Sequence, residues 1–233
     1  MCGRMVLTRS AAEIAADFDG FEGETGFEWP PRYNLAPSQN LLAIRADPEG
    51  HLGFAQLRWG LIPSWAREAS MGHRLINARS ETASEKPSFR SAFRSRRCLI
   101  PADGFYEWLR PDSGKSRARA PSIPHFFRRR DGLGLMMAGL WETWTDRTTG
   151  ECIDSCTILT TSANADVVPI HHRMPVLLES NRWTEWLDPE LKAAGRIEPM
   201  LVPAASDTLE HFEVGTHVNH PRHDAPDCIE PAA

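Results

Sequence analysis

The chain has 233 residues, of which 41% are hydrophobic, so it is long enough to bury a substantial core. Its 26 Lys and Arg against 31 Asp and Glu give a net charge of −5, which argues against nucleic-acid binding driven by overall charge. No apolar run approaches the roughly 18 residues that span a bilayer, and the amino end lacks a signal-peptide core, so a membrane or secreted protein is not expected.

The amino-terminal residues predict a strand followed by a capped helix. We expect the strand over residues 3–8 and the helix over residues 10–18, with Ser10 as N-cap and Glu13 completing a capping box. The stretch 19–32 is rich in Gly, Glu and Pro, which predicts a loop.

Most of the remaining predicted elements are short strands rich in β-branched or aromatic residues. These strands cover residues 41–45, 54–59, 98–101, 105–109, 125–130, 133–141 and 155–161. The other expected elements are helices over 80–93 and 180–187, a short helix over 163–168 and an exposed loop over 110–124. Because strands dominate without a βαβ rhythm or an internal repeat, we predict a single α+β domain of mainly antiparallel, curved, barrel-like sheets with interspersed short helices.

Basic residues and tryptophans are distributed in a way that suggests a nucleic-acid surface in spite of the net charge. Lys and Arg gather in residues 86–97 and 117–130, and the chain has eight tryptophans, whose faces suit the stacking of single-stranded bases. The five cysteines are odd in number and lack paired CxxC spacing, so we expect reduced thiols and a cytoplasmic protein.

The cysteine at position 2 offers unusual chemistry if Met1 is removed. Cys2 then carries an α-amine and a thiol two carbons apart, both with usable unprotonated fractions near neutral pH. With an aldehyde, the amine forms an imine and the thiol closes a five-membered thiazolidine. The thiol alone could instead attack an acyl carbon, as in a cysteine peptidase, and a small residue in a first strand is the alternative without function.

Further polar residues occur where a core does not favour them. Asn77 directly follows an apolar segment, and His171 lies at a turn before a strand. Glu107 lies between aromatic residues on the same strand face as Phe105, which is expected to raise the pKa of its carboxyl toward the range of proton transfer. The alternative for Glu107 is an edge-strand glutamate that faces water.

Together these segments resemble the SOS response-associated peptidase (SRAP) family, in family order and over nearly the whole chain. The motifs that carry the resemblance are Cys2-Gly3-Arg4, Tyr33-Asn34-Leu35-Ala36-Pro37, Trp59-Gly60-Leu61-Ile62-Pro63, Asn77-Ala78-Arg79-Ser80-Glu81-Thr82, Arg97-Cys98-Leu99-Ile100-Pro101, Gly104-Phe105-Tyr106-Glu107-Trp108 and His171-His172-Arg173-Met174-Pro175.

The resemblance implies a protein of the DNA damage response that shields abasic sites in single-stranded DNA by a covalent thiazolidine crosslink through Cys2. It implies that Asn77 hydrogen-bonds the bound sugar or amine, that Glu107 is the general acid and base, and that His171 helps open the sugar ring and serves reversal. It also implies DNA-binding residues, which are Arg4, Arg79 and Arg173 on phosphates and Pro37, Trp65 and Trp108 near bases.

Two positions depart from the family pattern. Ala66 stands where some relatives carry a second tryptophan, so we expect weaker base stacking there. Position 172 is His where relatives often have Asp, and we assign catalysis to His171 because it keeps the spacing to Arg173.

Residues 1–219 are expected to form the SRAP-like domain, with an active form that begins at Cys2, and residues 220–233 a flexible tail. His217, His220, His223 and Cys228 have spacing that suggests a metal site, but Pro221, Pro226 and the acidic surroundings favour the tail, so no metal or other cofactor is expected.

Two further functions remain open at this point. One is a thiol peptidase that uses Cys2 with His171 and Glu107, acting only on its own amino terminus, and the other is a noncovalent single-strand-binding module. An abasic-site lyase reaction is a related activity. In each case we expect a monomeric cytoplasmic protein, associated with the nucleoid when bound to DNA.

Overall fold

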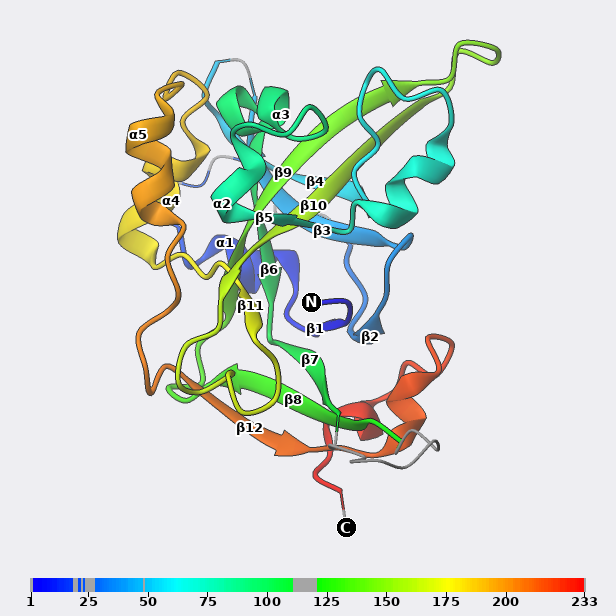
Figure 1. Ribbon diagram of the computed structural model, residues 1–233, viewed down its shortest axis with the longest axis vertical. Helices are drawn as coiled ribbons and strands as arrows, with labels where there is room; N and C mark the ends of the chain where they lie inside the picture. The colour runs from blue at the N-terminus through cyan, green and yellow to red at the C-terminus, as the bar shows by residue number, and fades with distance from the viewer. Residues whose placement is uncertain are drawn as a thin grey trace, which may run out of the picture.

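The computed structural model describes residues 2–18, 21, 23, 28–47, 49–110 and 121–232. In this part of the chain two sheets lie one above the other, with short helices around the upper one (Figure 1). The predicted α+β class, with curved sheets and short helices in one domain, is confirmed.

The larger sheet contains a closed five-stranded barrel. Its strands are β3 (Asn40–Ala46), β4 (Leu52–Trp59), β6 (Arg97–Ala102), β9 (Leu135–Thr145) and β10 (Cys152–Ser162). Antiparallel pairs run from β4 through β3, β6 and β9 to β10, and the parallel pair of β10 with β4 closes the ring. Two three-residue strands, β5 (Asn77–Arg79) and β11 (Arg173–Pro175), pair with β10 near its carboxyl end.

The smaller sheet is antiparallel throughout and lies below the barrel in Figure 1. Its strands, in spatial order, are β12 (Leu209–Glu213), β8 (Ile123–Arg129), β7 (Gly104–Leu109), β1 (Met5–Leu7) and β2 (Arg32–Leu35). Only Asp103 separates β6 from β7, so the chain passes directly from one sheet to the other. The Asp103 carboxylate accepts hydrogen bonds of 2.6 Å from both the amide and the hydroxyl of Thr8, which fixes β1 at this crossing.

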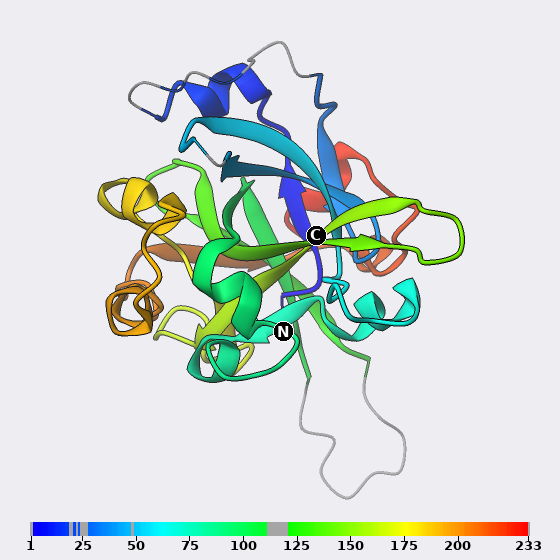
Figure 2. The same ribbon diagram turned by 90° about the horizontal axis from the view of Figure 1, so that it is seen from above.

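Short helices connect and cover the strands. They are α1 (Ala11–Ala15), α2 (Ser80–Ala83), α3 (Arg90–Ser95), α4 (Ser180–Leu187), α5 (Ala194–Ile197) and the 3-10 turns η1 (Ala69–Arg74), η2 (Glu198–Met200), η3 (Thr216–Asn219) and η4 (Pro226–Ile229). Seen from above, the β9–β10 hairpin projects beyond the rest of the molecule (Figure 2). Among the described residues, no helix has the length and apolar character needed to cross a bilayer.

Several predicted elements are confirmed and others are wrong. The capping box of α1 is present, since Ser10 accepts from the Glu13 amide while the Glu13 carboxylate accepts from the Ser10 amide. The single helix expected over 80–93 is instead two, because Pro87 lacks an N–H and disfavours helical geometry at the residue before it. Residues 163–164 have no regular structure and residues 165–168 form turns, so the helix expected over 163–168 is wrong. Much of the expected 110–124 loop lies outside the described residues.

The segment 220–232 differs from the expected flexible tail, because it packs against the smaller sheet. The Asp224 carboxylate accepts from the amides of Tyr33 and Asn34 and pairs with Arg32, while Cys228 is fully buried. The Asn34 amide nitrogen donates to the carbonyls of His220 and His223 at 3.1 and 2.7 Å. These contacts span nearly 200 positions of sequence, so local composition did not reveal them.

Arg97, at the start of β6, is a buried cation that holds several backbone carbonyls. It is 3% exposed and donates to the carbonyls of Trp186, Phe93, Arg94 and Asp188. Burial lowers the pKa of its guanidinium to about 10, so it is charged at neutral pH. Arg97 therefore joins the barrel to the ends of α3 and α4.

Replacing Arg97 with Met is expected to lower the free energy of unfolding by about 3 kcal/mol or more, because it leaves buried carbonyls without donors. Urea denaturation monitored by circular dichroism measures the change. Arg94→Met, on the exposed surface of α3, is the matched control and should change stability by less than about 0.5 kcal/mol. Equal stabilities of the two variants would contradict the role assigned to Arg97.

Candidate functional site

Cys2 lies in the interior, opposite β7. The β1–β7 register pairs Met5 with Phe105, and the Tyr106 amide donates to the Arg4 carbonyl at 3.0 Å, so continuing this register toward the amino end brings residues 2 and 3 alongside Glu107 and Trp108. The Cys2 side chain is fully buried. Burial, with a smaller contribution from the Glu107 carboxylate, raises the pKa of the Cys2 thiol well above its usual range.

Glu107 is buried, so the alternative of a glutamate that faces water is wrong. Its residue exposure is 3%, and Phe105, on the same face of β7, stacks on Phe127 with 5.0 Å between ring centroids. Burial raises the pKa of the Glu107 carboxyl above 4.5, as the flanking aromatic residues had led us to expect. A carboxyl whose pKa is raised in this way is suited to act as a general acid or base.

His171 lies close to that carboxyl. Its Nδ1 is 3.9 Å from Glu107 Oε1, and the Arg173 amide donates to the same nitrogen at 3.0 Å. Burial lowers the pKa of His171 below 6.5, so the ring is mostly neutral at pH 7. The same Nδ1 also lies 3.1 Å from the Arg173 carbonyl oxygen. The His172 ring is exposed and stacks on His171 at 4.4 Å.

Asn77 begins β5 and has an amide suited to a ligand. Its Oδ1 and Nδ2 are buried, and neither has a hydrogen-bond partner within the described part of the chain. Buried polar atoms are nearly always satisfied, so an amide of this kind points to a bound polar group.

The strands that carry Asn77 and His171 meet at the same end of β10. Thr160 pairs with Arg79 of β5 on one side and with Pro175 of β11 on the other. Arg173 ties this junction together, because it donates to the Thr160 carbonyl and forms a bidentate ion pair with Glu81 at 2.5 and 2.9 Å. The junction therefore brings the segments of Asn77 and His171 together.

The predicted DNA contacts fall into two groups. The Arg79 side chain is exposed and makes no hydrogen bond or ion pair to another described residue, and Trp65 is 51% exposed. Pro37 is half-buried in the turn between β2 and β3. Arg4 and Trp108 are instead engaged with the carboxy-terminal segment.

The contacts of Arg4 and Trp108 are short and specific. Arg4 Nη1 donates to Asn34 Oδ1 at 2.7 Å and to the Val218 carbonyl at 2.6 Å. Trp108 Nε1 donates to Asn219 Oδ1 at 2.6 Å, and the Arg4 guanidinium lies 5.9 Å from the Trp108 ring centroid. Both side chains are thus positioned by residues 218 and 219.

Sequence reasoning gave no role to three residues that position the site. Asn34 holds Arg4, Glu81 holds Arg173, and Asn219 holds Trp108. Asn34 and Glu81 lie inside the motifs that resemble the SRAP family, and this was the one sequence feature that could have drawn attention to them. The contact between Asn219 and Trp108 joins residues more than 100 positions apart, so no local pattern predicted it.

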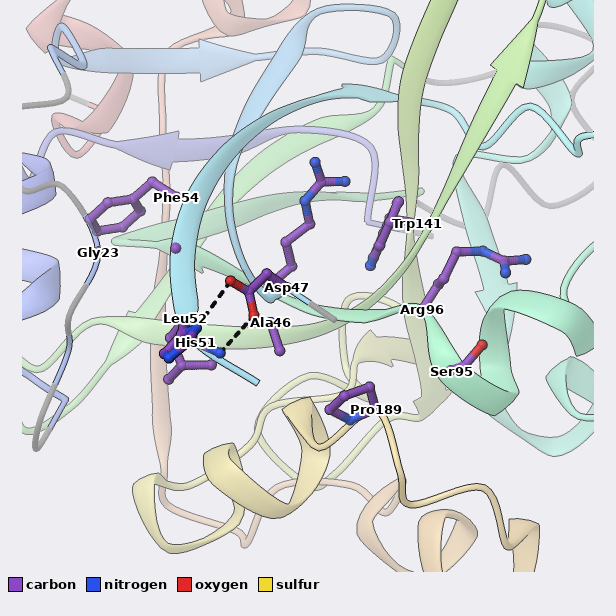
Figure 3. Close-up of a pocket in the computed structure, with 12 residues that line it drawn as sticks. Gly23, Ala46, Asp47, His51, Leu52, Phe54, Ser95, Arg96, Trp141 and Pro189 are labelled. Carbon is purple, nitrogen blue, oxygen red and sulfur yellow. Dashed lines mark hydrogen bonds and ion pairs between the residues drawn. The ribbon is translucent and has the colours of Figure 1, made fainter. Parts of the chain in front are cut away.

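A separate pocket of about 670 Å³ lies on the barrel (Figure 3). Arg45 lies over the Trp141 ring at 4.1 Å within it, and Asp47 holds His51 at its rim. None of the predicted site residues lines this pocket. The pocket is therefore not part of the candidate site around Cys2.

Comparison with known proteins supports one assignment across the chain. Residues 1–221 match the family model described as SOS response associated peptidase (SRAP). The chain is 39% identical to the abasic site processing protein YoaM of Bacillus subtilis, covering 99% of this chain and 98% of that protein. It is 31% identical to the abasic site processing protein HMCES of Xenopus tropicalis, covering 98% and 78% respectively.

Solved structures show the same architecture. A crystal structure of a protein from Bacteroides thetaiotaomicron is 25% identical and covers all of both chains, with a TM-score of 0.85. A protein from Bordetella bronchiseptica is 30% identical and covers 92% of this chain and 100% of its own, with a TM-score of 0.73. The barrel and the smaller sheet are thus shared as one unit.

Proposed function

Because the chain belongs to the SOS response-associated peptidase family, we propose that it processes abasic sites in single-stranded DNA by forming a covalent crosslink through Cys2. Relatives that match nearly the whole chain are named as abasic site processing proteins, which supports the substrate class. The crosslink is a thiazolidine, and it requires that Met1 has been removed.

One observation carries this proposal. The Glu107 carboxyl is buried, lies near enough to the Cys2 thiol to help raise the pKa of that thiol, and is 3.9 Å from Nδ1 of the His171 ring. A nucleophile next to two groups with shifted pKa values is typical of a reactive site and is hard to explain as core packing.

The reaction balances without any cofactor. The α-amine of Cys2 adds to the aldehyde carbon of the ring-opened deoxyribose, and the resulting carbinolamine loses water to give an imine. The Cys2 sulfur then adds to the imine carbon, and the thiol proton passes to the nitrogen. The product is a thiazolidine, and one water molecule is released.

The neighbouring side chains supply the proton transfers. Glu107 takes a proton from the attacking amine and returns one to the departing hydroxyl, a role that suits its raised pKa. Neutral His171 accepts or donates a proton as the sugar ring opens, since Nδ1 and Nε2 then offer one acceptor and one donor. Asn77 hydrogen-bonds the bound sugar or amine through its buried amide.

The alternative of a thiol peptidase fits this site less well. Such an enzyme attacks with a thiolate, whose formation needs a lowered thiol pKa. Burial and the Glu107 carboxylate raise the pKa of the Cys2 thiol instead. Amine attack needs no thiolate, so the environment favours attack by nitrogen first and ring closure by sulfur second.

The test is a denaturing gel of the Met1-processed protein with single-stranded DNA that contains one natural abasic site. We expect a slowly migrating covalent band. DNA with a tetrahydrofuran analogue, which has no aldehyde, is the matched control and should give none. Absence of the band with the natural site would refute the proposed reaction, while a band with both substrates would refute the requirement for an aldehyde.

Arg79 is the side chain best placed to contribute a phosphate contact without giving up a protein partner. Arg79→Ala is expected to weaken binding to undamaged single-stranded DNA and to reduce the slope of log affinity against log salt by about 0.7, the value for one phosphate contact. Fluorescence anisotropy over a salt series measures both quantities. Arg182→Ala, exposed on α4, is the control that should leave the slope unchanged, and an unchanged slope in Arg79→Ala would contradict the contact.

A further inference from the structure

The carboxy-terminal segment carries a cluster of metal-ligand side chains that the site around Cys2 does not use. His217 comes from η3, His223 from the following turn, and Asp227 and Cys228 from η4. One ligand atom from each of the four lies within 4.8 Å of the other three. The segment runs beside β8 and β7 at the lower right of Figure 1.

The distances inside the cluster are close to those of a metal site. Donor atoms at zinc–ligand distances of about 2.0–2.3 Å in a tetrahedron lie roughly 3.3–3.8 Å from each other. His223 Nε2 is 2.8 and 3.0 Å from the two carboxylate oxygens of Asp227, and His217 Nε2 is 3.9 Å from Asp227 Oδ2. Small side-chain movements would therefore accommodate one ion among them.

The backbone around these residues is fixed by contacts outside the cluster. Asn34 donates to the His223 carbonyl at 2.7 Å, and the Tyr106 hydroxyl donates to the Cys228 carbonyl at 3.2 Å. Gly215 leaves room for the imidazole of His217, since a Cβ at Gly215 would lie 2.3 Å from its Cε1. The ligand side chains thus project from a held scaffold, not from the free tail that the prolines suggested.

We propose that His217, His223, Asp227 and Cys228 bind one Zn²⁺ ion. Imidazole, thiolate and carboxylate are all donors that zinc takes, and four of them complete a tetrahedral site. Binding releases the Cys228 proton to solvent, and the thiolate and the carboxylate together balance the charge of the ion. The Zn²⁺ joins η3 to η4.

The proposed Zn²⁺ ion would take no part in a reaction at Cys2 and would affect it only by fixing nearby side chains. Residues 218 and 219, next to His217, hold Arg4 and Trp108. A bound ion that fixes η3 would therefore also fix the side chains of Arg4 and Trp108, which lie close in sequence to Cys2 and Glu107. The inference does not depend on the crosslinking reaction, because metal binding is measured without DNA.

The test uses the full chain purified from zinc-supplemented medium. We expect about one equivalent of zinc per chain by elemental analysis, a lower unfolding midpoint after chelation, and recovery of that midpoint when Zn²⁺ is added back. Co²⁺ in place of Zn²⁺ should give a thiolate charge-transfer band. A purified protein that holds no metal and whose unfolding midpoint does not shift when Zn²⁺ is added would overturn the proposal. The cluster would then be only a hydrogen-bonded His223–Asp227 pair.

Variants separate a zinc site from surface binding. His223→Ala should lose the bound metal and the Zn²⁺-dependent shift, and Cys228→Ser should lose the charge-transfer band. Because Cys228 is buried and its replacement risks misfolding, the partly exposed His223 carries the test. His220→Ala and Cys152→Ser, both exposed and outside the cluster, are the matched controls. Zinc retained equally by His223→Ala and the controls would refute the site.

Discussion

Replacing Cys2 with alanine is expected to abolish the covalent crosslink to abasic DNA while preserving the fold and noncovalent DNA binding. The variant keeps an α-amine but has no sulfur to close the ring, so at most a reversible imine forms. Cys2 is fully buried, and the smaller alanine side chain should cost only about 1 kcal/mol of stability. A denaturing gel measures the crosslink, a native gel measures binding, and urea denaturation verifies folding.

Two further variants sharpen this result. Cys2→Ser keeps the amine and nearly the same shape, so borohydride should trap its imine, whereas the untreated complex should dissociate. Cys152→Ser removes an exposed thiol elsewhere and should crosslink like the wild type. A persistent crosslink from Cys2→Ser without a reductant would contradict thiazolidine closure, and loss of crosslinking in Cys152→Ser would show that another thiol takes part.

The local features of this fold could be predicted from the sequence because local chemistry produces them. The Ser10–Glu13 capping box lies within one helical turn, and the longer strands carry the β-branched and aromatic residues that favour extended backbone. The three-residue strands β5 and β11 are too short to show a period, so they were not predicted.

The closure of the barrel depends on contacts that no local pattern encodes. Strand β10 pairs in parallel with β4, so that Cys156 lies opposite Trp59, almost 100 positions away. The same limitation applies to the carboxy-terminal segment, whose prolines suggested a tail although Asp224 and Asn34 hold it to β2. Long-range pairing, not composition, decided both outcomes.

In the candidate site, too, some features follow from local sequence and others only from long-range contacts. Alternation along β7 placed Glu107 and Phe105 on one face, but only the position of β1 and the barrel makes that face the buried one. The proximity of His171 to Glu107 follows from the pairing of β11 with the end of β10, a contact between short strands. The residue types were therefore predictable, and their geometry was not.

Replacing Glu107 with glutamine is expected to slow crosslink formation by about 100-fold or more, because the amide cannot exchange the protons of imine formation. The affinity for undamaged single-stranded DNA should not change, since the residue is 3% exposed. Quenched-flow gels give the rate constant and anisotropy gives the affinity. Glu213→Gln, in the same row of the sheet but exposed at the end of β12, is the matched control and should crosslink at the wild-type rate.

Glu107→Gln is expected to slow the reaction but not to lower the free energy of unfolding, so the two measurements separate a role in chemistry from a role in folding. Burial raises the folded-state pKa of Glu107 above 4.5, so its contribution to stability is present below pH 4.5 and is lost as pH rises through the folded pKa. Glutamine does not ionise, so the variant loses no stability in this way as pH rises. Glu107→Gln should therefore be as stable as the wild type or more stable at pH 8, with a smaller change in unfolding free energy between pH 5 and pH 8. A variant that is both slow and less stable at pH 8 would indicate that Glu107 supports the fold as an anion, because a buried neutral carboxyl loses little when an amide of the same shape replaces it.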